Sequence, residues 1–155
     1  ANWGKLAFGD ESELDLSLPP NTPFVIGCNE KKCLPHGHVV TDNIKDSFGK
    51  QRSRVSGAHC NIRLPSRLET GEAPQPRPQP LLQDTSTNGT WLNFQRLERN
   101  ESKALQNGDL IKLVNPDASQ DESVKCPENL LFTFSDTRPM NFISYRLRLL
   151  PIDLP

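Results

Sequence analysis

Short stretches in which apolar and polar residues alternate recur along most of the chain. Between residues 59 and 64, Cys60, Ile62 and Leu64 alternate with polar neighbours, a pattern typical of a strand with one buried face. Segments of this kind predict eight strands, at residues 3–8, 14–18, 24–27, 59–64, 81–82, 90–92, 110–114 and 130–134.

Turn residues separate these segments. Asn88-Gly89 and Asn107-Gly108-Asp109 tolerate the positive φ that tight turns require, and the fourteen prolines disfavour long helices. Many short strands with such turns predict an all-β fold, an antiparallel β-sandwich.

Two polar stretches interrupt the strand pattern. Residues 69–80 carry four prolines and almost no apolar side chains, so they are predicted to form a loop insertion. Residues 115–128 form a second polar loop, whose acidic residues lack the spacing of a calcium site. We expect one domain over residues 1–136 and a C-terminal extension or linker over residues 137–155.

Composition and charge exclude several classes of function. The formal net charge of −1 argues against direct nucleic-acid binding, and no apolar run approaches the ~20 residues of a membrane span. The four cysteines, Cys28, Cys33, Cys60 and Cys126, form no C-x-x-C pair. Zinc bound by Cys33 with His36 and His38 is the less favoured alternative. We expect free thiols in a reducing, intracellular compartment, with no metal and no cofactor.

Two motifs carry the candidate chemistry. The first is R-x-S-x-x-H, with Arg54, Ser56 and His59, and the second is S-x-N-G-T-x-x-N at residues 86–93. Hydroxyls, amides and one guanidinium suit the binding of an anion such as phosphate. The chain has three histidines, and no Ser or Cys lies in a known nucleophile motif, so we expect a binding module and not an enzyme.

Taken together, Gly27, Ser56-x-x-His59, Asn88-Gly89 and Asn93 resemble the pattern of a forkhead-associated (FHA) domain. The resemblance runs from about residue 3 to residue 134 and is greatest to the FHA domains of checkpoint Ser/Thr kinases. It implies an FHA-type β-sandwich with recognition loops at one end, at residues 28–36, 51–57 and 84–88. It also implies binding of phosphothreonine segments of partner proteins in checkpoint or meiotic signalling in the nucleus. A kinase domain of that family would lie outside these 155 residues.

The resemblance also implies roles for single residues. Ser56 resembles the serine that binds phosphate, and Thr87 the residue that touches phosphate or the threonine γ-methyl group. Asn88 resembles the asparagine that hydrogen-bonds the peptide backbone, and Arg54 one that reads an acidic side chain three positions after the phosphothreonine. The alternative interpretations are that Ser56 only caps a turn, that Thr87-Asn88-Gly89 is an ordinary tight turn and that Arg54 is a solvated loop residue. The residues that resemble the scaffold of the site are Gly27, His59, Gly89 and Asn93.

One position departs from the family pattern. The family's arginine after the glycine of the third strand grips the phosphate, whereas Cys28 follows Gly27 here. Loss of such a contact weakens binding on the order of tenfold to a hundredfold. Either another cation compensates (Lys31, Lys32, Arg52 or Arg54), or Cys28 marks a loss of function, or the site has become a phosphate-independent scaffold for self-association or docking. A redox role of Cys28 is a further alternative.

Overall fold

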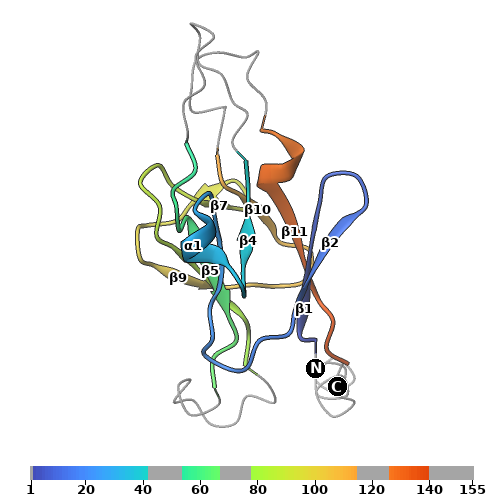
Figure 1. Cartoon of the computed structure of the whole chain (residues 1–155). Helices are drawn as coiled ribbons and strands as arrows, with labels where there is room; N and C mark the ends of the chain where they lie inside the picture. Colours follow the sequence, from blue (N-terminus) through green and yellow to red (C-terminus); the bar gives the residue numbers. More distant parts are fainter. Residues whose placement is uncertain (1, 42–53, 67–77, 115–125, 140–155) are drawn as a thin grey trace, which may run out of the picture.

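The computed structural model describes residues 2–41, 54–66, 78–114 and 126–139, and these form two packed β-sheets (Figure 1). The six-stranded sheet has the order β2-β1-β11-β10-β7-β8. Its strands are β1 (Gly4–Phe8), β2 (Ser12–Leu16), β7 (Trp91–Leu92), β8 (Gln95–Arg96), β10 (Leu110–Lys112) and β11 (Leu131–Asp136). The predicted β-sandwich is confirmed.

The second sheet has five strands in the order β4-β3-β5-β6-β9. Its strands are β3 (Phe24–Gly27), β4 (His38–Val39), β5 (Cys60–Arg63), β6 (Leu81–Asp84) and β9 (Ser102–Ala104). Every pairing is antiparallel except that of β3 with β4, which are parallel, with Ile26 opposite His38. A parallel pair needs a crossover, and the short helix α1 (Glu30–Cys33) lies within this one. This pair is the one parallel exception among the described pairings of the predicted antiparallel sandwich.

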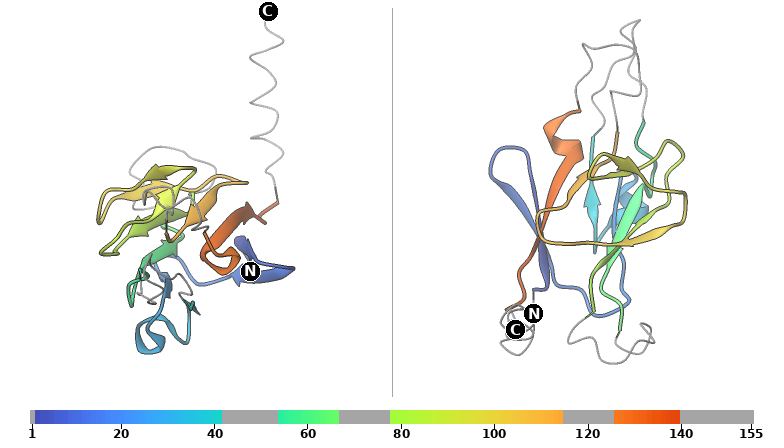
Figure 2. Two further views of the ribbon diagram at one scale, coloured as in Figure 1. Left: turned by 90° about the horizontal axis from the view of Figure 1, so that it is seen from above. Right: turned by 180° about the vertical axis from the view of Figure 1, so that it is seen from behind.

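Alternating side chains from the two sheets pack in one hydrophobic core. Figure 2 shows the ribbon of the two sheets from above and from behind. In β5, Cys60 and Ile62 are fully buried, and in β11 Phe132 and Phe134 are fully buried. The register places Leu6 of β1 opposite Phe134, so inward-facing residues of neighbouring strands pack against each other. Burial of these alternating positions is what selects a strand with one inward face over a helix.

All eight predicted strands overlap strands of the structure, but several short elements were missed. These are β4, β8, β9, α1 and the 3-10 helix η2 (Glu128–Leu130). The missed strands are short and carry little apolar signal, since β8 and β9 are exposed and β4 is only half-buried. In α1 the signal is local, since Asn29 Oδ1 accepts bonds from the Lys31 and Lys32 N–H groups at 2.9 and 3.4 Å.

Some predictions fall on residues outside the described ranges. These are most of the Pro-rich stretch (residues 69–77), the polar loop from 115 to 125, the binding-loop residues 51–53 and the C-terminal extension from residue 140. At the described ends, Arg138 pairs with Asp136 at 2.9 Å and donates to the Pro78 carbonyl at 2.7 Å. The division into residues 1–136 and 137–155 stays a prediction.

Candidate functional site

The loop of residues 54–59 lies against the end of β3. Cys28 N–H donates to the Ser56 carbonyl at 3.1 Å, and Asn29 N–H donates to the Gly57 carbonyl at 3.2 Å. The Cys28 thiol donates to the Val55 carbonyl at 3.2 Å. A Cβ at Gly27 would overlap the Gly57 carbonyl group, so only glycine allows this close approach. The contacts of Gly27, Cys28 and Asn29 at the end of β3 therefore fix the position of Ser56.

His59 connects this loop to a second one. Its side chain is fully buried, its Nδ1 accepts a bond from Ser56 N–H at 3.0 Å, and its Nε2 lies 2.7 Å from the Gly89 carbonyl. Because Nδ1 accepts, the ring proton belongs on Nε2, which donates to that carbonyl. The two bonds use both ring nitrogens, so His59 acts here as a structural link and is not available for acid–base chemistry.

The second loop, residues 85–90, is built around a buried carboxylate. Asp84 Oδ1 accepts bonds from Ser86 N–H at 3.0 Å, Ser86 Oγ at 2.6 Å and Thr90 Oγ1 at 2.8 Å. Ser86 Oγ in turn accepts a bond from Gly89 N–H at 2.8 Å. Sequence reasoning assigned no role to Asp84 or Thr90, because a polar residue at the end of a strand is usually exposed. The D-x-S-x-x-x-T spacing is the signal that could have found them.

The two loops meet at hydrogen bonds between their tips. Thr87 N–H donates to Ser56 Oγ at 3.0 Å, and Asn88 Nδ2 donates to the Arg54 carbonyl at 3.3 Å. Thr87 and Asn88 are exposed, whereas Arg54 and Ser56 are half-buried. The structure thus brings together all four residues predicted to bind peptide. Since Cys60 pairs with both Ile26 and Asp84, the flanking strand ends lie at one end of the five-stranded sheet.

The predicted scaffold residues divide into two groups. His59 and Gly89 belong to the two loops, and Gly27 at the end of β3 contacts the first of them. Gly89 adopts φ +109°, a conformation that favours glycine. Asn93 lies apart, because its Nδ2 donates to Asp109 at 2.8 Å and its Oδ1 accepts from Leu110 N–H at 2.8 Å. Asn93 holds the β7–β8 turn to the turn before β10.

The polar groups of the site are hydroxyl donors on the two loops and the side chains that line a hollow beside Thr87, Arg96 and Arg99 among them. Ser56 Oγ accepts one bond and keeps its own proton to donate, and Thr87 adds a second hydroxyl. Burial raises the pKa of the Cys33 thiol, which donates to the Gly57 carbonyl at 3.3 Å. Beside Thr87 a hollow of 380 Å³ is lined by Asp84, Ser86, Thr87, Arg96, Leu97, Glu98 and Arg99. Hydroxyls and exposed amides at a loop tip, next to a hollow, suit an anionic peptide side chain.

The described residues contain no group of three or more His, Cys, Asp or Glu side chains placed to hold a metal ion. Within the same ranges, no helix is long and apolar enough to cross a membrane. His38 is half-buried, and burial lowers its pKa. Its ring lies 5.0 Å from that of Phe8, so it packs as an aromatic residue.

Fold and site together define a β-sandwich recognition module whose binding residues lie on loops. The model of the FHA domain family matches residues 24–114, which include both loops. This range is more than half of the sequence, so the chain belongs to the FHA domain family. Its members bind phosphothreonine peptides, as complexes of its structural neighbours show.

Several solved structures are similar to this chain. The N-terminal FHA domain of S. cerevisiae Rad53p, in complex with a phosphothreonine peptide, is 26% identical with a TM-score of 0.58, covering 87% of this chain and 94% of that one. The MEK1 FHA domain in complex with a HOP1 phosphothreonine peptide is 18% identical with a TM-score of 0.57, covering 89% and 100%. An FHA domain of a hypothetical Arabidopsis thaliana protein is 19% identical with a TM-score of 0.54, covering 90% of each chain. The comparison with curated proteins gave no match.

Proposed function

We propose that this chain binds phosphothreonine segments of partner proteins through Ser56, Thr87, Asn88 and Arg54, and that it recruits those partners in checkpoint or meiotic kinase signalling in the nucleus. The observation that carries the proposal is the 3.0 Å bond between Thr87 N–H and Ser56 Oγ, which sets two hydroxyl-bearing residues side by side at an exposed loop tip. A phosphate at this point meets both hydroxyls. The adjoining hollow leaves room for a neighbouring peptide side chain.

The position of Asn88 supports a role in holding the peptide backbone. Its Nδ2 is used by the Arg54 carbonyl, and its exposed side chain leaves Oδ1 to accept a bond from a peptide N–H. The signalling role is supported by likeness to the Rad53p and MEK1 FHA domains, both solved with phosphothreonine peptides.

The second candidate function is a scaffold that self-associates or docks without phosphate. Cys28 favours it, because an exposed thiol that donates to the Val55 carbonyl supplies no positive charge. The two functions differ in whether binding depends on the phosphate group.

A degenerate phosphothreonine peptide library, incubated with the immobilised chain before and after phosphatase treatment, tests the proposal. We expect enrichment of a defined set of peptides that disappears after phosphatase treatment and weakens with added salt. Equal retention of treated and untreated peptides would reject phosphate recognition and favour the scaffold.

A further inference from the structure

A bound phosphate monoester needs positive charge, and the cationic side chain within the two loops is that of Arg54. Phosphothreonine carries about 1.5–2 negative charges at neutral pH. Ser56 and Thr87 offer neutral hydroxyls, and the Cys28 thiol is turned to the Val55 carbonyl. The family resemblance gives Arg54 to an acidic side chain of the peptide, so a neighbouring element is the source of a cation for the phosphate itself.

The helix α1 is fixed against the Ser56 loop by several contacts. Asn29 N–H and the Cys33 thiol both donate to the Gly57 carbonyl, at 3.2 and 3.3 Å. Asn29 also caps the helix through its side chain. These contacts hold both ends of α1 and thereby fix the backbone of Lys32, which lies between them, relative to Gly57.

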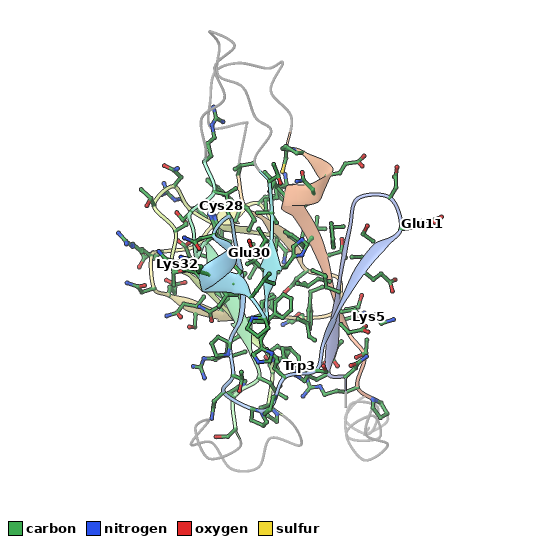
Figure 3. All side chains as sticks on the ribbon, in the orientation of Figure 1. Trp3, Lys5, Glu11, Cys28, Glu30 and Lys32 are labelled. Atoms are coloured by element: carbon green, nitrogen blue, oxygen red, sulfur yellow. The ribbon has the colours of Figure 1, made fainter. Side chains whose placement is uncertain are left out.

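Lys32 is the cation on this helix that reaches the loop. A Cβ built on Gly57 would lie 3.4 Å from Lys32 Cδ and 3.5 Å from Lys32 Nζ. Because Gly57 has no side chain, it leaves space for Lys32. The Lys32 ammonium therefore lies beside Gly57, the residue that follows Ser56 in the sequence. Figure 3 shows Lys32 and Cys28 near each other, on the side of the molecule away from Lys5 and Glu11.

The ammonium of Lys32 has no competing carboxylate among the described residues, where the ion pairs are Lys5–Glu13, Lys103–Glu101 and Arg138–Asp136. Its positive charge acts to lower the pKa of the nearby Cys33 thiol, but burial has the larger effect and raises that pKa. An unpaired, exposed ammonium beside a loop rich in donors is free to meet an incoming anion.

We propose that Lys32 supplies the positive charge for the phosphate, acting from α1 in place of the side chain at position 28. The ligand class is a phosphate monoester dianion on a peptide, held between Lys32 Nζ and the hydroxyls of Ser56 and Thr87. This inference rests on the proposed function and adds to it the identity of the cation.

The test compares Lys32→Met with Lys31→Met. Both variants remove one exposed lysine charge from the same helix and keep the backbone N–H groups that Asn29 caps. The probe is a phosphothreonine peptide that the parent chain has enriched from the library, titrated by calorimetry. We expect about tenfold or weaker affinity for Lys32→Met and a change within about twofold for Lys31→Met. Lys32→Arg should bind within about threefold of the parent.

Equal affinities of Lys32→Met and Lys31→Met, with the parent binding in a phosphate-dependent way, would overturn the assignment of Lys32 alone. A parent chain that binds no phosphothreonine peptide would overturn the proposed function and this inference with it. Melting temperatures within about two degrees of the parent, expected for an exposed side chain, show that the variants are folded.

Discussion

Each polar atom of Ser56 has a separate task in the structure. Its N–H donates to His59 Nδ1, its carbonyl accepts from Cys28 N–H, and its Oγ accepts from Thr87 N–H. The sequence motif identified Ser56 and His59 because their spacing is local. That motif does not include Asp84, whose role depends on burial and on the three donors of Ser86 and Thr90 that it accepts from in the folded chain.

Replacing His59 with alanine tests this link. His59→Ala leaves Ser56 N–H and the Gly89 carbonyl without their partner, and each unsatisfied buried group costs about 1–3 kcal/mol. We expect the free energy of unfolding, measured in urea, to fall by about 2–4 kcal/mol, with weaker peptide binding. Ser12→Ala, at an exposed position of β2 outside the predicted recognition loops, is the control and should change neither property. A His59→Ala protein as stable as the parent would show that the link is not structural.

We expect substitutions at Cys28 and Lys32 to have coupled effects on the affinity for phosphothreonine peptides. An arginine at position 28 starts beside the Ser56 loop, so Cys28→Arg adds a second cation to the phosphate site. We expect Cys28→Arg to tighten phosphothreonine binding by at least about tenfold in the Lys32→Met background and by less in the parent, where Lys32 already supplies charge. Calorimetry on the four proteins of this cycle measures the coupling. Equal gains in both backgrounds would mean that the two positions act independently.

At the scale of elements, the apolar pattern predicted the strands with buried or half-buried apolar side chains and missed exposed ones such as β8 and β9. The inward faces of β5 and β11 were readable because several apolar residues repeat at every second position. By contrast, β9 is exposed along its length and exists because β6 lies beside it. The placement of α1 against Gly57 was equally unreadable, because it depends on contacts between residues more than twenty positions apart.

The thiols report on the packing of these elements. Cys28 is exposed, whereas Cys33 of α1 and Cys60 of β5 are buried, and burial raises the pKa of both buried thiols. A raised pKa lowers the thiolate fraction at any pH below it, and the thiolate is the reactive form. We expect iodoacetamide at about neutral pH to modify Cys28 first and Cys33 and Cys60 last. Peptide mass spectrometry follows the order of modification. Modification of Cys33 as fast as Cys28 would mean that α1 does not pack as described.

The whole molecule is a sandwich of two open sheets, with the candidate site at one end of the five-stranded sheet. β1 pairs with both β2 and β11, so the N-terminal strands and the last described strand share one sheet. Large exposed apolar side chains in the described ranges are Leu34, 45% exposed, and Phe94, 73% exposed. The Lys112 ammonium lies 4.7 Å from the Phe94 ring centroid, which partly covers it.

Among the described residues, these two apolar side chains do not form the extended patch that a stable interface needs. We therefore expect the chain to sediment as a monomer at micromolar concentration, with or without a phosphothreonine peptide. Analytical ultracentrifugation measures this directly. A dimer whose stability is unaffected by Ser56→Ala and by phosphate would support the scaffold function.

The central claim is that phosphate is held where the Ser56 and Thr87 loops meet. Calorimetric titration of the enriched peptide, phosphorylated and unphosphorylated, into the parent and into Ser56→Ala/Asn88→Ala measures it most directly. Asn2→Ala/Ser12→Ala, at two exposed residues near β1 and β2, is the matched control. We predict that the parent and the control bind only the phosphorylated peptide, and that Ser56→Ala/Asn88→Ala binds it more than about a hundredfold more weakly while keeping its cooperative melting. Unchanged affinity of the folded double variant would contradict the account.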